Sequence, residues 1–281
     1  MKLQEIIDQI PIKPFYQEEA GVIYCGDCID VMKEIPDNSI DLVVTSPPYD
    51  DLRDYGGYVF NFEPTAKELF RILEDGGVVV WVVGDATKDG SETGSSFRQA
   101  LFFKEVGFNL HDTMIYQKTG MPMPDTVRYY QNFEYMFIFS KNRPKSINLL
   151  KDRINRWSGE KQFGKPSTRM KDGSLRTRNE DKRIIDNKYG IRFNVWQYKT
   201  GFGYSTKDEI AFKHPAIFPD KLAGDHIQSW SNKNDIVLDI FSGSGTTPKM
   251  AKMMGRRFIG IEKEKKYCEI AERRLSQDYL F

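Results

Sequence analysis

The sequence predicts an α/β protein built on a mostly parallel sheet with helices on both faces. Short apolar segments alternate with segments of helical periodicity along most of the chain. Some apolar segments are almost continuous, as in residues 78–85 (VVVWVVGD), which is typical of a strand buried on both faces. The length of 281 residues suits one large domain of this class, or one domain with a substantial insertion.

Seven segments have the pattern of strands, and they are residues 21–27, 40–46, 78–85, 109–118, 134–141, 236–241 and 257–262. Five segments have the pattern of helices, and they are residues 28–35, 65–77, 95–108, 246–254 and 265–276. In the second of these helices, Gly76 and Gly77 predict the end.

The alternation of strands and helices stops between about residues 142 and 198. Residues 141–188 hold 15 Lys and Arg against 6 Asp and Glu, so the formal charge of this segment is +9, whereas that of the whole chain is only +1. Residues 159–183 have almost no apolar side chains. Two interpretations stay open and are compatible: a solvated loop, and a surface that neutralises nucleic-acid phosphates. The predicted domains are residues 1–140, an insertion at 141–204, and residues 205–281.

Composition favours a cytoplasmic protein without a membrane or metal site. No apolar run approaches the roughly 20 residues that span a bilayer, and the N-terminus lacks the apolar core of a signal peptide. The three cysteines do not form a disulfide framework. Cys25 and Cys28 form a C-x-x-C pair, but a zinc or redox site needs further ligands, and the chain has only three histidines.

The strand at residues 40–46 runs into a stiff corner, Ser46-Pro47-Pro48-Tyr49. Two prolines fix the backbone, which suits either a rigid turn or polar groups held in place for chemistry. The corner alone favours the turn.

A glycine turn follows the strand at residues 236–241. Gly243 and Gly245 allow a ligand to approach the backbone closely, and the helix after them offers free N–H groups to an anionic group. Glu262 ends the next strand, where an acid can accept both hydroxyls of a ribose. Pro248 occupies the place of the third glycine of the dinucleotide fingerprint, so the spacing predicts an adenosine group rather than a dinucleotide.

Four segments together resemble the DNA amino-methyltransferases that use S-adenosylmethionine. They are residues 26–28 (GDC), 46–49 (SPPY), 214–219 (HPAIFP) and 239–247 (DIFSGSGTT). The resemblance implies a Rossmann-like methyltransferase fold with a seven-stranded sheet. The catalytic motif precedes the basic segment and the cofactor turn follows it, which resembles the β-ordered, circularly permuted group. The basic insertion then falls where that family has its target-recognition region.

The resemblance also implies roles for individual residues. The catalytic residues would be Ser46, Pro47, Pro48 and Tyr49. The cofactor-binding residues would be Asp27, Cys28, His214, Pro215, Phe218, Asp239, Phe241, Gly243, Gly245, Thr246, Thr247 and Glu262. Members with serine first in the catalytic motif mostly methylate cytosine N4, so Ser46 implies N4-methylcytosine as the product.

Duplex DNA is the implied partner, bound with the target base flipped out of the stack. The arginines expected to contact it are Arg53, Arg153, Arg156, Arg169, Arg176 and Arg178. A cognate restriction endonuclease and a monomeric or homodimeric state are further expectations. The alternatives are an enzyme acting on adenine N6, RNA or a protein amide, and a non-catalytic nucleic-acid-binding module.

Overall fold

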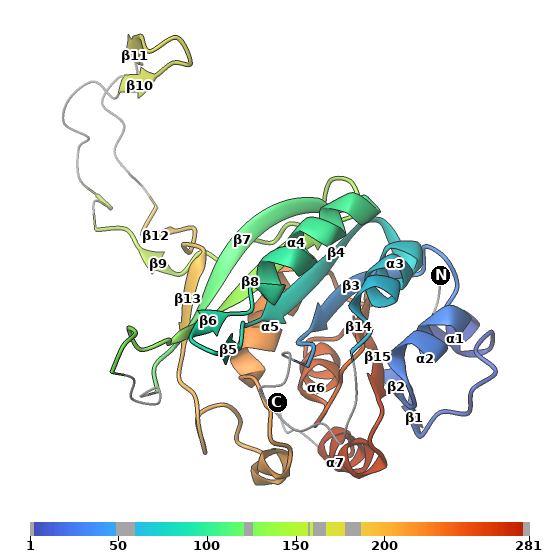
Figure 1. Cartoon of the computed structure of the whole chain (residues 1–281). Coiled ribbons are helices and arrows are strands. Elements are labelled where there is room, and N and C mark those ends of the chain that lie inside the picture. Colours follow the sequence, from blue (N-terminus) through green and yellow to red (C-terminus); the bar gives the residue numbers. More distant parts are fainter. Residues whose placement is uncertain are drawn as a thin grey trace. The chain divides into compact units, whose positions relative to one another are not determined.

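The computed structural model describes residues 3–48, 60–120, 126–156, 158–159, 167–177 and 187–277. The chain divides into two compact units (Figure 1). The first contains Met1–Asn148 and Asn194–Phe281, and the second contains Leu149–Phe193. No helix among the described residues is long and apolar enough to cross a membrane.

The first unit is built on a sheet in which nine described strands pair in the order β1-β2-β15-β14-β3-β4-β8-β7-β13. These strands are β1 (Tyr16–Glu18), β2 (Gly21–Cys25), β3 (Ile40–Thr45), β4 (Leu73–Val83), β7 (Asn109–Lys118), β8 (Phe133–Ser140), β13 (Val195–Tyr198), β14 (Ile236–Asp239) and β15 (Arg257–Glu262). From β2 to β4 every neighbouring pair is parallel, while β8 is antiparallel to both β4 and β7. All seven predicted strands are present, joined by the edge strands β1 and β13.

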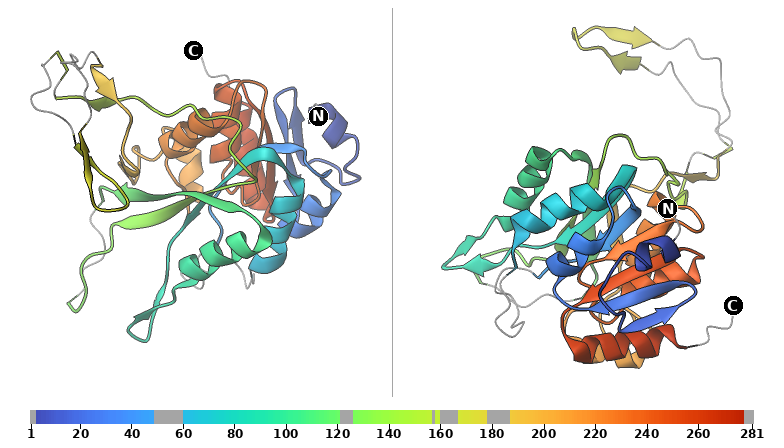
Figure 2. Two further views of the ribbon diagram at one scale, coloured as in Figure 1. Left: turned by 90° about the horizontal axis from the view of Figure 1, so that it is seen from above. Right: turned by 90° about the vertical axis from the view of Figure 1, so that its right-hand side faces the viewer.

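Helices cover both faces of this sheet. They are α1 (Leu3–Ile7), α2 (Cys28–Glu34), α3 (Phe62–Ile72), α4 (Ser95–Val106), the 3-10 helix η1 (Glu209–Lys213), α5 (Asp220–Trp230), α6 (Thr246–Met253) and α7 (Lys265–Leu275). Helices α2, α3 and α4 contact one another in series, and so do α5, α6 and α7. Figure 2 shows the second series on the face opposite α3 and α4. The predicted α/β fold with a large, mostly parallel sheet is therefore confirmed.

The helix predicted at residues 65–77 ends at Ile72, before the glycines that were expected to stop it. Leu73 is already extended, with ψ 133°, and pairs with Ile40 at the start of β4. Gly76 then makes a left-handed kink at φ 76°, and its N–H donates to the Lys141 carbonyl at 2.7 Å. The two glycines therefore belong to an irregular strand start rather than to a helix end. Helix α5 was not predicted from the sequence, and it lies between the HPAIFP segment and β14.

The strand arrangement places four chain segments at one edge of the sheet. The strands β2, β15, β14 and β3 are adjacent and parallel, so their carboxyl ends lie together. Open parallel sheets bind ligands at this edge. The strands β3 and β14 are buried over almost their whole length, which holds the edge rigid.

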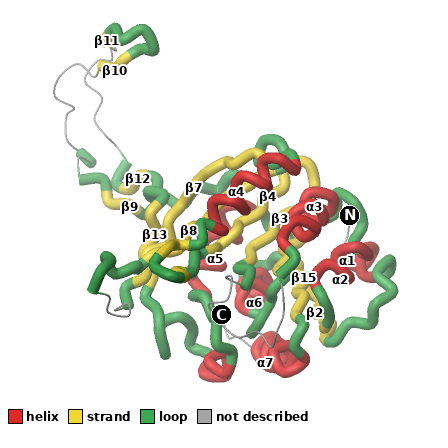
Figure 3. Tube along the Cα trace, viewed as in Figure 1, coloured by secondary structure: helices red, strands yellow, loops and turns green. Residues whose placement is uncertain are grey.

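The second unit contains two small antiparallel pairs, one of β9 (Arg153–Ile154) with β12 (Tyr189–Gly190) and one of β10 (Ser167–Arg169) with β11 (Leu175–Thr177). Outside these pairs, the described part of this unit is loop (Figure 3). The guanidinium of Arg153 stacks on Phe193, 4.7 Å from the ring centre, and donates to the Ile191 carbonyl at 2.9 Å.

Candidate active site

A cavity of about 840 Å³ opens at the carboxyl edge of the sheet, entirely within the first unit. Its lining includes the residues that follow the four adjacent strands: Gly26 and Asp27 after β2, Ser46 and Pro47 after β3, Phe241 and Gly243 after β14, and Lys263 after β15. Cavities of this size hold drug-sized ligands with most of their surface buried.

The corner after β3 is anchored from below by the neighbouring strand. Thr45 donates its hydroxyl to Asp239 Oδ1 at 2.7 Å, and Asp239 Oδ1 also accepts the Phe241 N–H at 3.1 Å. On the same strand, the Val44 carbonyl accepts the Thr247 hydroxyl at 3.1 Å. These bonds tie the strand that ends in Ser46 to both sides of the glycine turn.

Asp239 is 1% exposed, and burial raises the pKa of its carboxyl group from 3.8 to about 6. The hydrogen bonds from Thr45 and Phe241 act in the opposite direction, because they favour the charged form. Asp239 does not line the cavity. Its position beneath the turn indicates that it holds the turn and the β3 corner together.

The turn after β14 has the left-handed backbone that its glycines predicted. Gly243 has φ 51° and Gly245, the N-cap of α6, has φ 78°. A Cβ at residue 243 would lie 3.0 Å from His214 Nε2, and one at residue 245 would lie 2.9 Å from Ala271 Cβ. Both positions are therefore closed to larger side chains, by conformation and by contact.

Glu262 faces this turn from the end of β15. Its Oε2 accepts the Gly243 N–H at 2.8 Å, and its Oε1 accepts the Glu264 N–H at 2.8 Å. Burial raises the pKa of Glu262, whereas these backbone bonds lower it. Each oxygen keeps a second lone pair for a ligand hydroxyl. The backbone bonds fix the orientation of the carboxylate, as a bidentate ribose contact requires.

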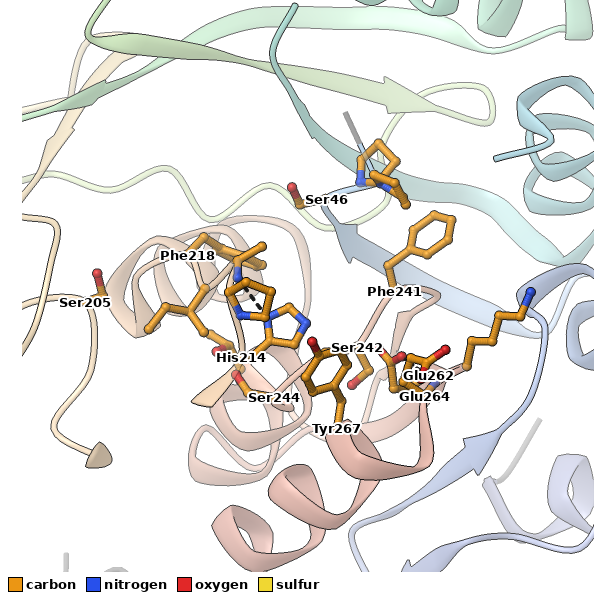
Figure 4. Close-up of a pocket in the computed structure, with 18 of the residues that line it drawn as sticks. Ser46, Ser205, His214, Phe218, Phe241, Ser242, Ser244, Glu262, Glu264 and Tyr267 are labelled. Carbon is orange, nitrogen blue, oxygen red and sulfur yellow. Dashed lines mark hydrogen bonds between the residues drawn. The ribbon is translucent and has the colours of Figure 1, made fainter. Parts of the chain in front are cut away.

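Aromatic and imidazole groups form another part of the wall (Figure 4). The His214 ring packs edge-on against Tyr267 at 4.2 Å, and its Nδ1 accepts the Ala216 N–H at 3.1 Å. In Figure 4, Phe241 lies between Ser46 and the pair formed by Glu262 and Glu264. The planar, apolar surfaces of Phe241 and Phe218 suit a heterocyclic ring.

Asp27 and the cysteines have structural partners. Asp27 is the N-cap of α2, and its Oδ1 accepts the Ile29 N–H at 3.0 Å. The thiols of Cys25 and Cys268 donate to the Lys263 and Glu262 carbonyls at 3.7 and 3.5 Å, and no disulfide joins any two of Cys25, Cys28 and Cys268. The described part of the chain contains no group of three His, Cys, Asp or Glu side chains arranged to hold a metal ion.

The structure brings most of the residues singled out by sequence into this one cavity. Its lining contains Ser46, Pro47, Pro48, Asp27, Cys28, His214, Pro215, Phe218, Phe241, Gly243, Thr246 and Glu262. Gly245 and Thr247, like Asp239, are not on the wall. Tyr49, Arg53 and Arg178 lie outside the described residues. Arg153, Arg156, Arg169 and Arg176 belong to the second unit.

Sequence reasoning missed several wall residues. Tyr116, Lys118 and Glu134 come from β7 and β8, and Lys118 forms an ion pair with Glu134. Tyr267 comes from α7. The first three belong to no recognisable motif. Tyr267 follows Glu262 by five residues, and this short spacing indicates that Tyr267 lies near the same cavity.

The comparison with known families shows to which family the chain belongs. The profile of the N6/N4 methyltransferase family, described as DNA methylase, matches residues 40–273, which is most of the chain. The chain belongs to this DNA methylase family. Methylases of this family take their methyl group from S-adenosylmethionine, so the predicted cofactor is confirmed.

Individual relatives agree with this assignment. The methylase is 61% identical over 245 residues to the orphan methyltransferase M.BamHII of Bacillus amyloliquefaciens, covering 87% of this chain and 92% of that protein. The fold is similar to that of the PvuII DNA methyltransferase (cytosine-N4-specific), with TM-score 0.71 and 23% identity over 97% of this chain and 92% of that one. The protein TTHA0409 from Thermus thermophilus, complexed with S-adenosyl-L-methionine, matches with TM-score 0.58 and 24% identity over 91% and 96% of the two chains.

The cavity of this methylase fits S-adenosylmethionine by its chemistry. Glu262 offers carboxylate oxygens beside the glycine turn, because its Oε2 accepts the Gly243 N–H at 2.8 Å. The first N–H groups of a helix have no intrahelical acceptor, so those of α6 can donate to an anionic group, and Phe241 offers a ring face. The left-handed Gly243 leaves no room for a Cβ beside His214, so the His214 ring lies directly against the backbone of the turn.

Proposed function

We propose that this methylase transfers a methyl group to the exocyclic N4 of cytosine in duplex DNA. The observation that carries the proposal is the shared cavity, which is lined by Ser46 and Pro47 as well as by Gly243 and Glu262. A polar corner for the target nitrogen and a nucleoside-binding turn for the methyl donor are thereby within reach of each other.

The residues of the corner act on the nitrogen that attacks. The lone pair of an exocyclic amino group is delocalised into the ring, so the nitrogen is a poor nucleophile. We propose that the Ser46 hydroxyl and the Pro47 carbonyl accept its two N–H groups and draw it towards a tetrahedral geometry. Pro47 and Pro48 hold these acceptors in place before the base arrives, which is electrostatic preorganisation. In the same scheme, Tyr49 stacks on the flipped base.

The turn and its surroundings hold the methyl donor. We assign the ribose hydroxyls to Glu262, the amino-acid part to the glycine turn with the start of α6, and the adenine ring to the region of Asp27, Cys28 and Phe241. Bound S-adenosylmethionine supplies an electrophilic methyl group on a sulfonium. Holding the two reactants in line supplies much of the rate.

We infer the target base from Ser46. Serine at the first position of the corner favours cytosine, and the solved structure similar over 97% of this chain is a cytosine-N4-specific enzyme. The second candidate is adenine N6, because the family includes enzymes for both nitrogens. A hydroxyl and a carboxylate can each accept an N–H from either base. Hydrogen-bond chemistry therefore does not choose between the two nitrogens, and an experiment must identify the methylated base.

We propose that the basic second unit binds the DNA and that the motif order is that of the permuted group. The catalytic corner at residues 46–49 precedes this unit and the cofactor turn follows it. Arg153, Arg156, Arg169 and Arg176 are the candidate phosphate or guanine contacts. The restriction endonuclease partner and the monomer-or-homodimer alternative stay predictions.

The test is nucleoside mass spectrometry of unmethylated DNA incubated with the enzyme and S-adenosylmethionine. N4-methylcytosine supports the proposal, and N6-methyladenine replaces the target base while keeping the mechanism. A Ser46→Ala variant with normal cofactor binding is the matched control. If wild-type enzyme binds the cofactor but forms neither product, RNA or protein becomes the favoured substrate.

A further inference from the structure

Helix α7 presents one face to the cavity and the glycine turn. Tyr267, Ala271 and Arg274 are spaced four and three residues apart, so they lie on the same side of the helix. Tyr267 packs against the His214 ring, and Ala271 lies against Gly245. Arg274 continues this face inward, where its side chain is 0% exposed.

A fully buried arginine needs partners for its charge, because removing the charge from water costs several kcal/mol. The guanidinium of Arg274 divides its donors between two groups of acceptors. Its Nε donates to Asp208 Oδ2 at 2.9 Å and its Nη2 to Asp220 Oδ1 at 3.0 Å. These carboxylates precede η1 and begin α5, so they flank the segment that carries His214 and Phe218.

The remaining nitrogen of the guanidinium binds the glycine turn. Arg274 Nη1 donates to the Ser244 carbonyl at 2.8 Å, to Ser244 Oγ at 3.1 Å and to Thr246 Oγ1 at 3.0 Å. Ser244 and Thr246 line the cavity, whereas Arg274 does not. One guanidinium therefore joins the turn to the two ends of another wall segment.

A second buried cation balances the charges. Lys249 Nζ contacts Asp208 Oδ2 and Asp220 Oδ2, each at 2.7 Å, and its side chain is 6% exposed. Burial alone would raise the pKa of Asp208, but the ion pairs with Lys249 and Arg274 outweigh burial and lower it. Two carboxylates and two cations give a neutral cluster. Lys249 supplies charge to the cluster, but among the described contacts only Arg274 extends it to Ser244.

We propose that Arg274 is a positioning residue for the methyl donor. It holds the Ser244 carbonyl and the Thr246 hydroxyl in the places that the donor's amino-acid part requires, and it aligns the His214 segment with them. The inference rests on the proposed role of the glycine turn in cofactor binding. It adds a residue of α7 that touches neither the donor nor the base.

The first test compares Arg274→Met with Arg273→Met. Arg273 is the next residue on α7 and is exposed. Losing the bonds of Arg274 to the turn removes hydrogen bonds from a charged donor, so we expect Arg274→Met to raise the cofactor Kd roughly 10-fold or more in calorimetry. At saturating cofactor, kcat should stay within about twofold of wild type, because the corner at Ser46 is intact. Arg273→Met should leave both unchanged.

Arg274→Met also leaves the cluster with an unbalanced negative charge, which can lower stability or prevent folding. The double variant Arg274→Met/Asp208→Asn restores neutrality but not the bonds to Ser244 and Thr246. We therefore expect it to recover most of the lost Tm while its cofactor Kd stays roughly 10-fold raised. If Arg274 acted only through charge balance, the double variant would recover both the Tm and the cofactor Kd of wild type.

Two results would overturn the proposal: an unchanged cofactor Kd in Arg274→Met, or recovery of the Kd together with Tm in the double variant. Gly243→Asp separates these from a failure of the proposed function. If Gly243→Asp binds the cofactor as wild type does, the turn is not the cofactor site. If Gly243→Asp loses binding and the Arg274 variants do not, the site stands and the positioning role falls.

Discussion

Asp239 makes the stability of this methylase depend on pH in a direction opposite to that of most carboxylates. The residue is 1% exposed, and burial raises the pKa of its carboxyl group from 3.8 to about 6. A carboxyl group whose pKa is raised by folding is held in its protonated form by the folded state. As the pH rises from about 4 to about 6, the unfolded chain loses this proton first, and the folded state loses stability.

The magnitude follows from the two pKa values. One pKa unit corresponds to about 1.4 kcal/mol, so the rise from 3.8 to about 6 corresponds to about 3 kcal/mol of unfolding free energy. This loss is absent below about pH 4 and complete above about pH 6. An asparagine in place of Asp239 would not titrate, and its amide oxygen could still accept the Phe241 N–H that the carboxyl group accepts.

The assay is urea unfolding of wild type and Asp239→Asn at several pH values and constant ionic strength. Other carboxyl groups titrate in both proteins, so the difference between the two is the measured quantity. We expect Asp239→Asn to gain about 2 to 3 kcal/mol relative to wild type between about pH 4 and about pH 7.

Thr45→Val is the matched control. It keeps the carboxyl group but removes a hydrogen bond of 2.7 Å that stabilises the charged form. The pKa of Asp239 should then rise further, and the loss of stability with pH should be larger than in wild type. A difference between Asp239→Asn and wild type that stays constant with pH would refute the reasoning, because it would mean that Asp239 ionises as freely in the folded protein as in the unfolded chain.

Three further predictions concern catalysis and binding. Ser46→Ala should lower kcat by roughly 10²-fold or more, as for other preorganised hydrogen-bond partners, while equilibrium cofactor binding stays unchanged; an equal loss of both would place Ser46 in the wrong role. Glu262→Gln should raise the cofactor Kd roughly 10-fold, because an amide N–H₂ donor replaces one of the two carboxylate oxygens that accept the Gly243 and Glu264 N–H groups. An unchanged Kd in calorimetry would show that Glu262 does not bind the ribose. Arg169→Gln combined with Arg176→Gln should reduce the salt slope of DNA binding by about 2 in anisotropy titrations if both contact phosphate, and an unchanged slope would contradict that role.

The parts of the site that the sequence predicts well are those carried by short segments at strand ends. Ser46, Gly243 and Glu262 each follow a strand whose apolar pattern is visible in the sequence. Parallel strands bring their carboxyl ends to one edge, so the convergence of these residues follows from the strand assignment. The fold class was predictable for the same reason.

Features that depend on distant partners were not predictable. Gly76 and Gly77 have the local appearance of a helix end, but pairing of Leu73 with Ile40 extends β4 over them. Helix α7 contains several Lys, Arg and Glu residues and resembles a solvated helix. The burial of Arg274 depends on Asp208 and Asp220, which are 66 and 54 residues away in the chain. Its helical spacing from Tyr267 and Ala271 places Arg274 on their side of α7, but the local sequence does not show which distant carboxylates balance its charge.

Buried charges on two sides of the glycine turn explain how a chain in two segments makes one site. Asp239 connects the turn to Thr45, 194 residues earlier, and Thr45 is followed by the catalytic Ser46 of our proposal. Arg274 connects the same turn to the His214 segment through Asp208 and Asp220. A displacement of the turn would strain hydrogen bonds to groups that cannot reach water, and each such group costs about 1 to 3 kcal/mol when left unpaired. The relative position of the corner and the turn is therefore held by polar bonds in the core, and the direct methyl transfer that we propose needs this separation to stay constant.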